Sequence, residues 1–169
     1  MTAILGGRPE GLTSLRFDDD LDTPAYRSRV DDYLGELDAL DAEVRDILAS
    51  LPAERRRLVT NHEVFGYFAA RYDFEVLGAV IPGGSTLAEP SAADLRELAA
   101  TIREAGVPAL FTETSSPTRL ADALAAEGAD VAVVALYSEA LGEPGSDGAT
   151  YLDMVRTNAR RIADALQAP

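Results

Sequence analysis

Apolar positions along the chain change their spacing near residue 52. Between residues 24 and 51 they recur every three or four residues, as on one face of a helix. This narrow seam has heptad spacing and consists of Val30, Tyr33, Leu37, Leu40, Val44, Ile47 and Leu51. Thr23 followed by Pro24 is typical of a helix start, and Pro52 ends the pattern. We predict one long helix that runs from residue 24 to about Leu51, within a segment bounded by residues 24–52.

Beyond residue 52, short apolar runs alternate with helical patterns. The predicted strands are residues 57–61, 74–81, 109–112 and 131–136, and the predicted helices are residues 63–72, 91–105, 117–128 and 150–166. The run at 131–136 is unbroken, which is typical of a strand buried on both faces. This alternation predicts a three-layer α/β domain with a four-stranded parallel sheet flanked by helices. The expected organisation is an irregular arm (1–23), the long helix (24–52) and an α/β lobe (53–169).

Helix ends carry local signals. Ser91 precedes a predicted helix with Asp94 three residues later, and Thr150 and Asp153 repeat this spacing. Gly106 follows the first of these helices, where a glycine is favoured in the left-handed conformation. These pairs predict capped helices that start at residues 91 and 150.

Composition excludes several kinds of site. The chain has no Cys, so disulfides, thiolate metal sites and cysteine nucleophiles are absent. It has no Lys, which excludes Schiff-base chemistry and the P-loop lysine. It has a single His, so this chain alone offers one imidazole to any ion.

The chain is strongly acidic, with a net charge of −14. Nine of these net negative charges lie between residues 18 and 54. Such a surface repels the phosphate backbone, so we expect no nucleic-acid partner. Most of the charge is explained by solubility, although an acidic surface also concentrates cations.

The first residues lack the charged and apolar regions of a signal peptide. We therefore expect a cytoplasmic protein if the chain is complete as given. The alternative is an exported protein whose export segment lies outside this sequence. No apolar run approaches the length of about 20 residues that a membrane-spanning helix needs.

Candidate chemistry lies where the predicted strands end, because ligands of parallel α/β sheets bind outside the carboxyl ends of the strands. His62 and Glu63 follow the first predicted strand, and Glu113 and Glu139 follow the third and fourth. An imidazole beside carboxylates suits a divalent cation. Each residue except Glu139 also has a plain structural role: His62 and Glu63 can serve the next helix, and Glu113 can pair with an arginine. Glu139 has no helix start to cap.

Other catalytic patterns are incomplete. The nucleophile motif G-x-S-x-G and the dinucleotide motif G-x-G-x-x-G do not occur. His62 and Glu63 begin an H-E-x-x-H zinc motif, but the chain has Gly66 where its second His belongs. A metal-dependent hydrolase built on His62 and Glu63 is disfavoured, because catalytic zinc takes three protein ligands.

Four stretches resemble the solute-binding subunits of zinc and manganese ABC transporters. They are LVTNHEVFGYFAARYDFEVLGAVIPGGSTLAEPS, VPALFTETSS, VVALYSEALG and TYLDMVRTNARRIADAL, and the similarity runs from about residue 25 to 166. The resemblance implies two α/β lobes joined by one long helix, with a metal ion between the lobes. It also implies an extracytoplasmic location and a partner ABC permease. This chain resembles the carboxyl-terminal lobe alone, preceded by the linking helix.

The resemblance also implies a ligand set. His62 matches the family's third metal ligand, and a His there is similar to the zinc-type pattern, so zinc is expected before manganese. Glu139 matches the fourth ligand, which is usually Asp, so it departs from the pattern by one methylene. The two ligands of the amino-terminal lobe have no counterpart in this chain.

Two ligands at an open edge make a weak site. Three alternatives follow: the chain does not bind the metal usefully, a separate amino-terminal lobe supplies the other ligands, or a second copy supplies them in a homodimer through the long helix or the metal edge. The first function hypothesis is therefore an isolated metal-binding lobe of an ABC uptake system, with no enzymatic activity. The alternative is a stand-alone structural domain that self-associates or docks a partner.

Overall fold

The computed structural model describes residues 24–60, 64–79, 91–112 and 117–167. They fall into two units that divide inside the long helix, one ending at Ala39 and one beginning at Leu40. The predicted arm at 1–23, the strand ends at 61–63 and 80–90, and Glu113 lie outside the described residues. Among the described helices, none combines the length and the apolar character that crossing a membrane requires.

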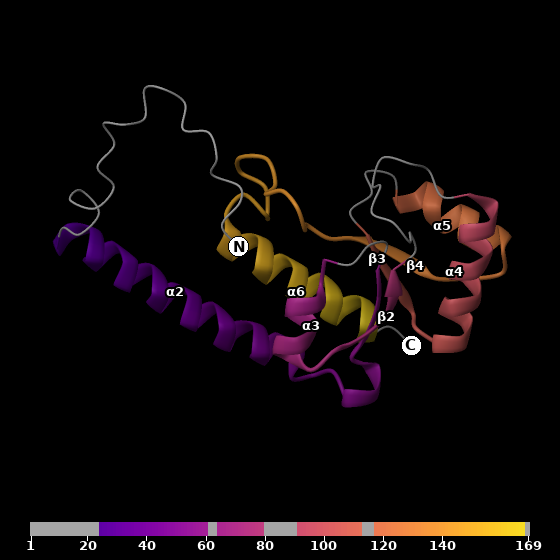
Figure 1. Cartoon of the computed structure of the whole chain (residues 1–169), viewed down its shortest axis with the longest axis horizontal. Coiled ribbons are helices and arrows are strands. Elements are labelled where there is room, and N and C mark those ends of the chain that lie inside the picture. The colour runs from indigo at the N-terminus through magenta and orange to yellow at the C-terminus, as the bar shows by residue number, and fades with distance from the viewer. Residues whose placement is uncertain (1–23, 61–63, 80–90, 113–116, 168–169) are drawn as a thin grey trace, which may run out of the picture. The chain divides into compact units, whose positions relative to one another are not determined.

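The elements alternate as the sequence predicts (Figure 1). In chain order they are α2 (Pro24–Leu48), a short 3-10 helix (Ala53–Arg55), β1 (Arg57–Thr60), α3 (Gly66–Tyr72), β2 (Glu75–Ala79), α4 (Ala92–Ala105), β3 (Ala109–Thr112), α5 (Pro117–Ala126), β4 (Ala132–Ala135) and α6 (Tyr151–Gln167).

The four strands form one parallel sheet in the order β2-β1-β3-β4. In the register, Thr60 at the end of β1 is opposite Phe111 of β3, and Thr112 at the end of β3 is opposite Ala135 of β4. The carboxyl ends of β1, β3 and β4 therefore meet at one edge of the sheet, with β3 in the middle. This arrangement confirms the predicted four-stranded parallel α/β fold.

Alternate residues of the strands enter two separate cores. Leu58 and Phe111 belong to the core shared with α2, α3 and α6, whereas Val59 and Leu110 belong to the core shared with α4 and α5. This period of two is the side-chain alternation of a strand. Helices thus cover both faces of the sheet, which is the predicted three-layer arrangement (Figure 1).

Strand β4 differs from its prediction. It lies at the edge of the sheet and is shorter than the apolar run, with Ala132 exposed and Val133 and Val134 only half-buried. The expectation that it is buried on both faces was wrong. The apolar run is longer than the strand because Val131 and Leu136, which flank β4, are also buried. An unbroken apolar run therefore does not show that the strand itself is buried on both faces.

Several element ends also differ from the prediction. Helix α3 begins at Gly66 rather than Glu63, with Phe65 as its N-cap, and α2 ends at Leu48 rather than Leu51. After Leu48 the chain turns, and the Leu51 amide donates to the Leu48 carbonyl (3.0 Å). A residue before proline is disfavoured in the helical conformation, so the helix ends before Leu51 reaches Pro52.

The predicted helix caps are confirmed. The Ser91 hydroxyl accepts from the Asp94 amide (3.3 Å), and the Asp94 carboxylate accepts from the Ser91 amide (2.8 Å). Gly106 closes the same helix with φ of 61°. At the start of α6, the Thr150 hydroxyl accepts from the Asp153 amide (3.1 Å). These contacts span only three residues, which is why local sequence predicts them.

Acids of α2 tie the helix to its own lobe. The carboxylate of Asp41 accepts two hydrogen bonds from the Arg71 guanidinium of α3 (2.9 and 2.7 Å), one from Arg45 (3.1 Å) and one from the Tyr72 hydroxyl (3.1 Å). These donors, with Arg71 first, lower the pKa of Asp41 to about 2. Burial, followed by the bond to Asp41, raises the pKa of Tyr72 to about 12. Part of the acidic excess is therefore structural as well as solubilising.

Replacing Asp41 by Asn is expected to weaken the acid dependence of stability. A carboxyl with a lowered folded pKa stabilises the fold above its ordinary pKa of 3.8, and this contribution is lost as the pH falls toward about 2. The difference in unfolding free energy between wild type and Asp41→Asn should be about 1 kcal/mol near neutrality, because solvent screens this partly exposed cluster. It should vanish toward pH 2.

Denaturant unfolding at a series of pH values measures this difference. Asp46→Asn is the matched control, since Asp46 is an exposed acid of the same helix. An equal pH-dependent difference for both variants would contradict the role assigned to the Asp41 cluster.

Candidate metal-binding edge

The candidate site lies at the carboxyl edge of the sheet. His62 follows Thr60, the last residue of β1, by two positions but lies outside the described residues. Glu139 follows β4 and is described, with an exposed side chain. Parallel strands lie about 4.8 Å apart, so the ends of β1 and β4, with β3 between them, are separated by roughly 10 Å. Of the two predicted ligands, the structure therefore describes only Glu139.

The loop that carries Glu139, residues 136–150, is fixed to α6 by a buried asparagine. Asn158 is 5% exposed. Its side chain forms hydrogen bonds with both backbone groups of Tyr137, the amide and the carbonyl. The Tyr137 amide donates to Asn158 Oδ1 (3.0 Å), and Asn158 Nδ2 donates to the Tyr137 carbonyl (2.6 Å). These two hydrogen bonds take the place of the bonds between strands that a longer β4 would make. Strand pairing therefore ends at a defined point, and Glu139 follows Tyr137 by two residues.

A second clamp comes from Arg161, one turn further along α6. Its guanidinium donates to the Ala135 carbonyl (2.9 Å) and to Asp147 Oδ2 (2.8 Å), and it lies over the Tyr137 ring at 5.1 Å. The Tyr137 hydroxyl donates to Asp147 Oδ1 (2.7 Å). This hydroxyl bond, followed by the arginine, lowers the pKa of Asp147. One arginine thus joins the end of β4 to the far side of the loop.

The two ends of the loop close on each other around the Tyr137 ring. The Gly142 amide donates to the Gly148 carbonyl (2.9 Å). A Cβ on Gly148 would lie 2.4 Å from Tyr137 Cε2, so the close approach of backbone to ring requires a glycine at this position. A Cβ on Gly142 would clash first with the Ser146 hydroxyl and would lie 3.1 Å from Tyr137 Cε1. Glu139 therefore projects from a closed, fixed loop.

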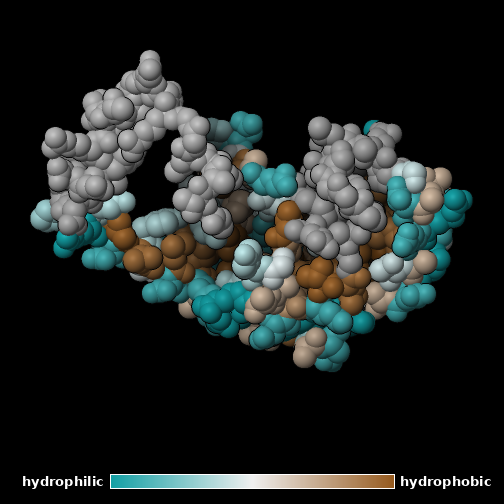
Figure 2. Space-filling view, viewed as in Figure 1, coloured by the Kyte–Doolittle hydropathy of each residue, from teal (hydrophilic) through white to brown (hydrophobic). Residues whose placement is uncertain are grey.

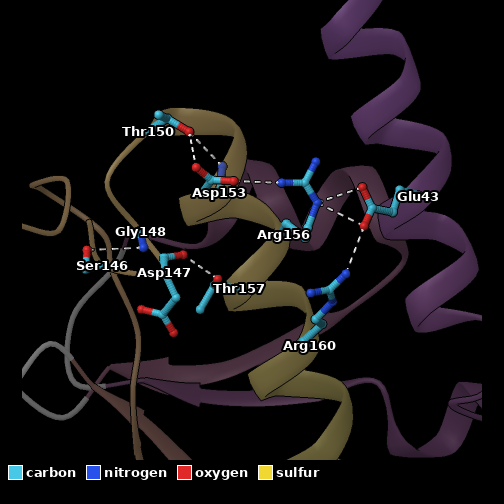
Figure 3. Close-up of polar contacts among 9 residues, drawn as sticks. All are labelled: Glu43, Ser146, Asp147, Gly148, Thr150, Asp153, Arg156, Thr157 and Arg160. Atoms are coloured by element: carbon cyan, nitrogen blue, oxygen red, sulfur yellow. Dashed lines mark hydrogen bonds and ion pairs between the residues drawn. The ribbon is translucent and has the colours of Figure 1, made fainter. Parts of the chain in front are cut away.

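The start of α6 extends the clamp toward α2 (Figure 3). Asp147 accepts through its carbonyl from the Thr157 hydroxyl, and Asp153 accepts from Arg156 (2.9 Å). Arg156 in turn donates to both carboxylate oxygens of Glu43 (2.8 and 2.9 Å), which also accepts from Arg160 (3.1 Å). The Glu43 carboxylate raises the pKa of Arg156. The candidate edge is thus braced through α6 to the long helix.

One polar atom beside Glu139 is left over. Ser138 Oγ is buried and makes no hydrogen bond within the part of the chain that the structure describes. A buried hydroxyl is normally paired, so Ser138 is an exception among the described residues. The described residues contain no group of three or more His, Asp or Glu side chains that could bind an ion together. A described cavity of about 280 Å³ lies at the other edge of the sheet, next to Arg57 and Pro108, and does not include Glu139.

Sequence reasoning did not find the residues that fix the loop. Asn158 was visible as a polar residue within the apolar stripe of the last helix, next to Val155 and Ile162. An asparagine on a buried face needs hydrogen-bond partners, because buried polar groups are normally paired. Its position was therefore a signal that Asn158 binds another part of the chain. Arg161 and Asp147 gave no such signal, because arginines and acids occur throughout the exposed surface.

Known proteins resemble the chain over most of its length. The sequence model of the family described as zinc-uptake complex component A, periplasmic (ZnuA), matches residues 18–165. The zinc-binding protein TroA of Treponema pallidum is 45% identical over 149 residues, which cover 85% of this chain and 48% of the relative. The manganese-binding lipoprotein MntA of Bacillus subtilis is 34% identical over 148 residues, with the same coverages.

A solved structure agrees with the sequence comparisons. The periplasmic zinc-binding protein TroA of Treponema pallidum matches with a TM-score of 0.70 and 44% sequence identity, over 83% of this chain and 52% of that chain. The four-stranded α/β fold is therefore shared with these binding proteins. The chain spans about half the length of the curated relatives it matches.

Proposed function

Because the chain belongs to the ZnuA family of metal-binding solute-binding proteins of ABC transporters, we propose that it acts as one metal-binding lobe of such an uptake system. Its cargo is a divalent ion, most favourably zinc. His62 supplies an imidazole nitrogen and Glu139 supplies a carboxylate oxygen. No bond of the cargo is made or broken, so the proposed role is binding rather than catalysis. The proposed location is extracytoplasmic, with an ABC permease as partner.

The clamped loop at the carboxyl edge carries this proposal. Metal-binding carboxylates need to be oriented, and orientation comes from the residues around them. Asn158 and Arg161 fix the backbone on both sides of the end of β4, so Glu139 is presented from a defined position. The end of β1, which precedes His62, lies on the same edge across β3. Side chains that start roughly 10 Å apart can bind one ion between them.

The donor set favours zinc over manganese. Imidazole nitrogen suits zinc, whereas sites made mainly of oxygen suit manganese and magnesium. The relatives include both a zinc-binding and a manganese-binding protein, so the family does not decide the metal. With two ligands from this chain, the remaining positions fall to water, to a separate amino-terminal lobe or to a second copy. We therefore expect weak binding by the chain alone.

Calorimetric titration of the purified chain with zinc and with manganese tests the proposal. We expect weak zinc binding that exceeds manganese binding. His62→Ala and Glu139→Gln should each lower the zinc affinity at least tenfold, because each removes one of two donors. Glu143→Gln is the matched control, since Glu143 is an exposed acid of the same loop.

Two results would contradict the assignment. Equal losses for Glu139→Gln and Glu143→Gln would mean that the acidic surface attracts cations without a site. Unchanged zinc affinity in both His62→Ala and Glu139→Gln would exclude these residues as ligands. Circular dichroism of each variant verifies that the fold is retained.

The alternative function is an interaction domain that works without metal. This alternative is favoured by four large apolar side chains of α2, from Tyr26 to Leu34, that are at least 36% exposed. Exposed apolar patches of this kind are typical of surfaces that bind another protein. His62→Ala separates the two functions. It should remove metal binding under the first and leave folding and association unchanged under the second.

A further inference from the structure

The first four turns of α2 expose an apolar stripe. Tyr26, Val30 and Tyr33 are 36%, 38% and 43% exposed, and Leu37, which is half-buried, continues the same spacing. The stripe lies in the unit that ends at Ala39, whereas the next seam residue, Leu40, is 5% exposed in the core of the lobe. Figure 2 shows apolar side chains gathered along this helix. The seam therefore has two parts: one buried in the lobe and one exposed.

The exposed part is complementary to itself when two copies run antiparallel. In such a pair, Val30 of each helix faces Tyr33 of the other, and Tyr26 faces Leu37. Each of the resulting four layers joins an aromatic ring to an aliphatic side chain. In the same register Pro24 is opposite Ala39, so the overlap uses the whole exposed stretch and ends where Leu40 enters the core of the lobe.

Charges beside the stripe have the matching arrangement. Arg29 and Glu36 are one heptad apart, and both occupy the flanking position that precedes a seam residue. In an antiparallel pair these flanking positions face each other, so Arg29 of each copy meets Glu36 of the other, twice by symmetry. In a parallel pair Arg29 would instead face Leu34 and Glu36 would face Asp41, so neither Arg29 nor Glu36 would meet an opposite charge. The charges therefore favour the antiparallel orientation.

We propose that two copies of this chain associate through an antiparallel pairing of α2 residues 24–39. The apolar stripe forms the centre of the interface, and the Arg29–Glu36 pairs flank it. This inference goes beyond the metal-binding function and does not depend on it. Four layers make an interface smaller than the standard of about 1,600 Å², so the dimer is weak and dissociates on dilution. Salt weakens it further, because its flanking pairs are exposed.

Sedimentation of the full chain, from micromolar to millimolar concentration and with a chelator present, tests the pairing. Wild type is expected to show a reversible monomer–dimer equilibrium. Arg29→Glu brings Glu against Glu36, and Glu36→Arg brings Arg against Arg29, so each variant alone should dimerise at least tenfold more weakly. An equimolar mixture of the two variants should regain association, because every flanking pair is then attractive.

The control is Asp32→Arg, which makes the same charge change as Glu36→Arg on the outer face of the helix. It should dimerise as wild type does. A wild-type chain that is monomeric throughout would overturn the proposal and leave the stripe to another partner, such as the half of the relatives that this chain does not span. A mixture that associates no better than its components, or a dimer unaffected by either variant, would also overturn it.

Discussion

Asn158→Ala is expected to lower the free energy of unfolding by about 3 kcal/mol. The change removes both hydrogen bonds to Tyr137 and leaves a partly buried amide and carbonyl without partners. A buried polar group that loses its partner costs about 1–3 kcal/mol, and here two such groups are affected at once. Chemical denaturation followed by circular dichroism measures the loss.

Asp164→Ala is the control for this change. Asp164 is an exposed polar residue on the same helix, so its truncation should alter stability by less than about 0.5 kcal/mol. A loss of similar size in both variants would mean that α6 is sensitive to any truncation. The clamp at Tyr137 would then have no special role.

The same variant also links stability to the candidate site. Where Asn158→Ala is still folded, the loop that carries Glu139 has lost the bonds that position it. Zinc affinity should therefore fall about tenfold or more, as it does when the residues that orient a ligand are removed. An unchanged zinc affinity in the folded variant would contradict the role of this loop in binding.

Gly148→Ala is expected to destabilise the fold by about 2 kcal/mol through overpacking. The new Cβ would lie 2.4–2.7 Å from three atoms of the Tyr137 ring. That ring cannot move freely, because its hydroxyl bonds Asp147 and the Arg161 guanidinium covers its face. The methyl group must therefore displace the ring or open the loop, and either movement breaks the clamp.

A double-mutant cycle with Tyr137→Ala identifies the clash. Tyr137→Ala is destabilising by itself, but it removes the ring that obstructs the new methyl group. Adding Gly148→Ala in this background should then cost less than about 0.5 kcal/mol. Gly66→Ala is the control for adding a methyl group, since no atom lies within 4 Å of a Cβ there. A full cost of Gly148→Ala in the Tyr137→Ala background would mean that the backbone, rather than the ring, resists the change.

Local features of this protein follow from the sequence alone. The alternation of strands and helices, the caps at Ser91 and Thr150, and the stop at Gly106 all appear where the spacing of residues predicts them. These features depend on contacts within one turn or on the period of one element. The existence and order along the chain of the four strands follow from the same patterns, whereas their exact ends do not: β4 spans Ala132–Ala135 rather than 131–136.

The candidate site was only partly predictable. Glu139 could be singled out because it follows a strand and has no helix to cap, and His62 because it is the single imidazole of the chain. Both assignments remain predictions. The sequence did not indicate how Glu139 is held, because Asn158 and Tyr137 are 21 residues apart and their pairing depends on how α6 lies against β4.

Tertiary structure alone decided the order of the strands and the use of the acids. The order β2-β1-β3-β4 puts β4 at the edge, and it is only half-buried although its apolar run predicted burial on both faces. Asp41 and Glu43 look like solvated acids in the sequence, yet they bind arginines of α3 and α6. Spacing along one helix specifies which face a residue occupies. Which element meets that face depends on contacts between distant segments, and those exist only once the chain has folded.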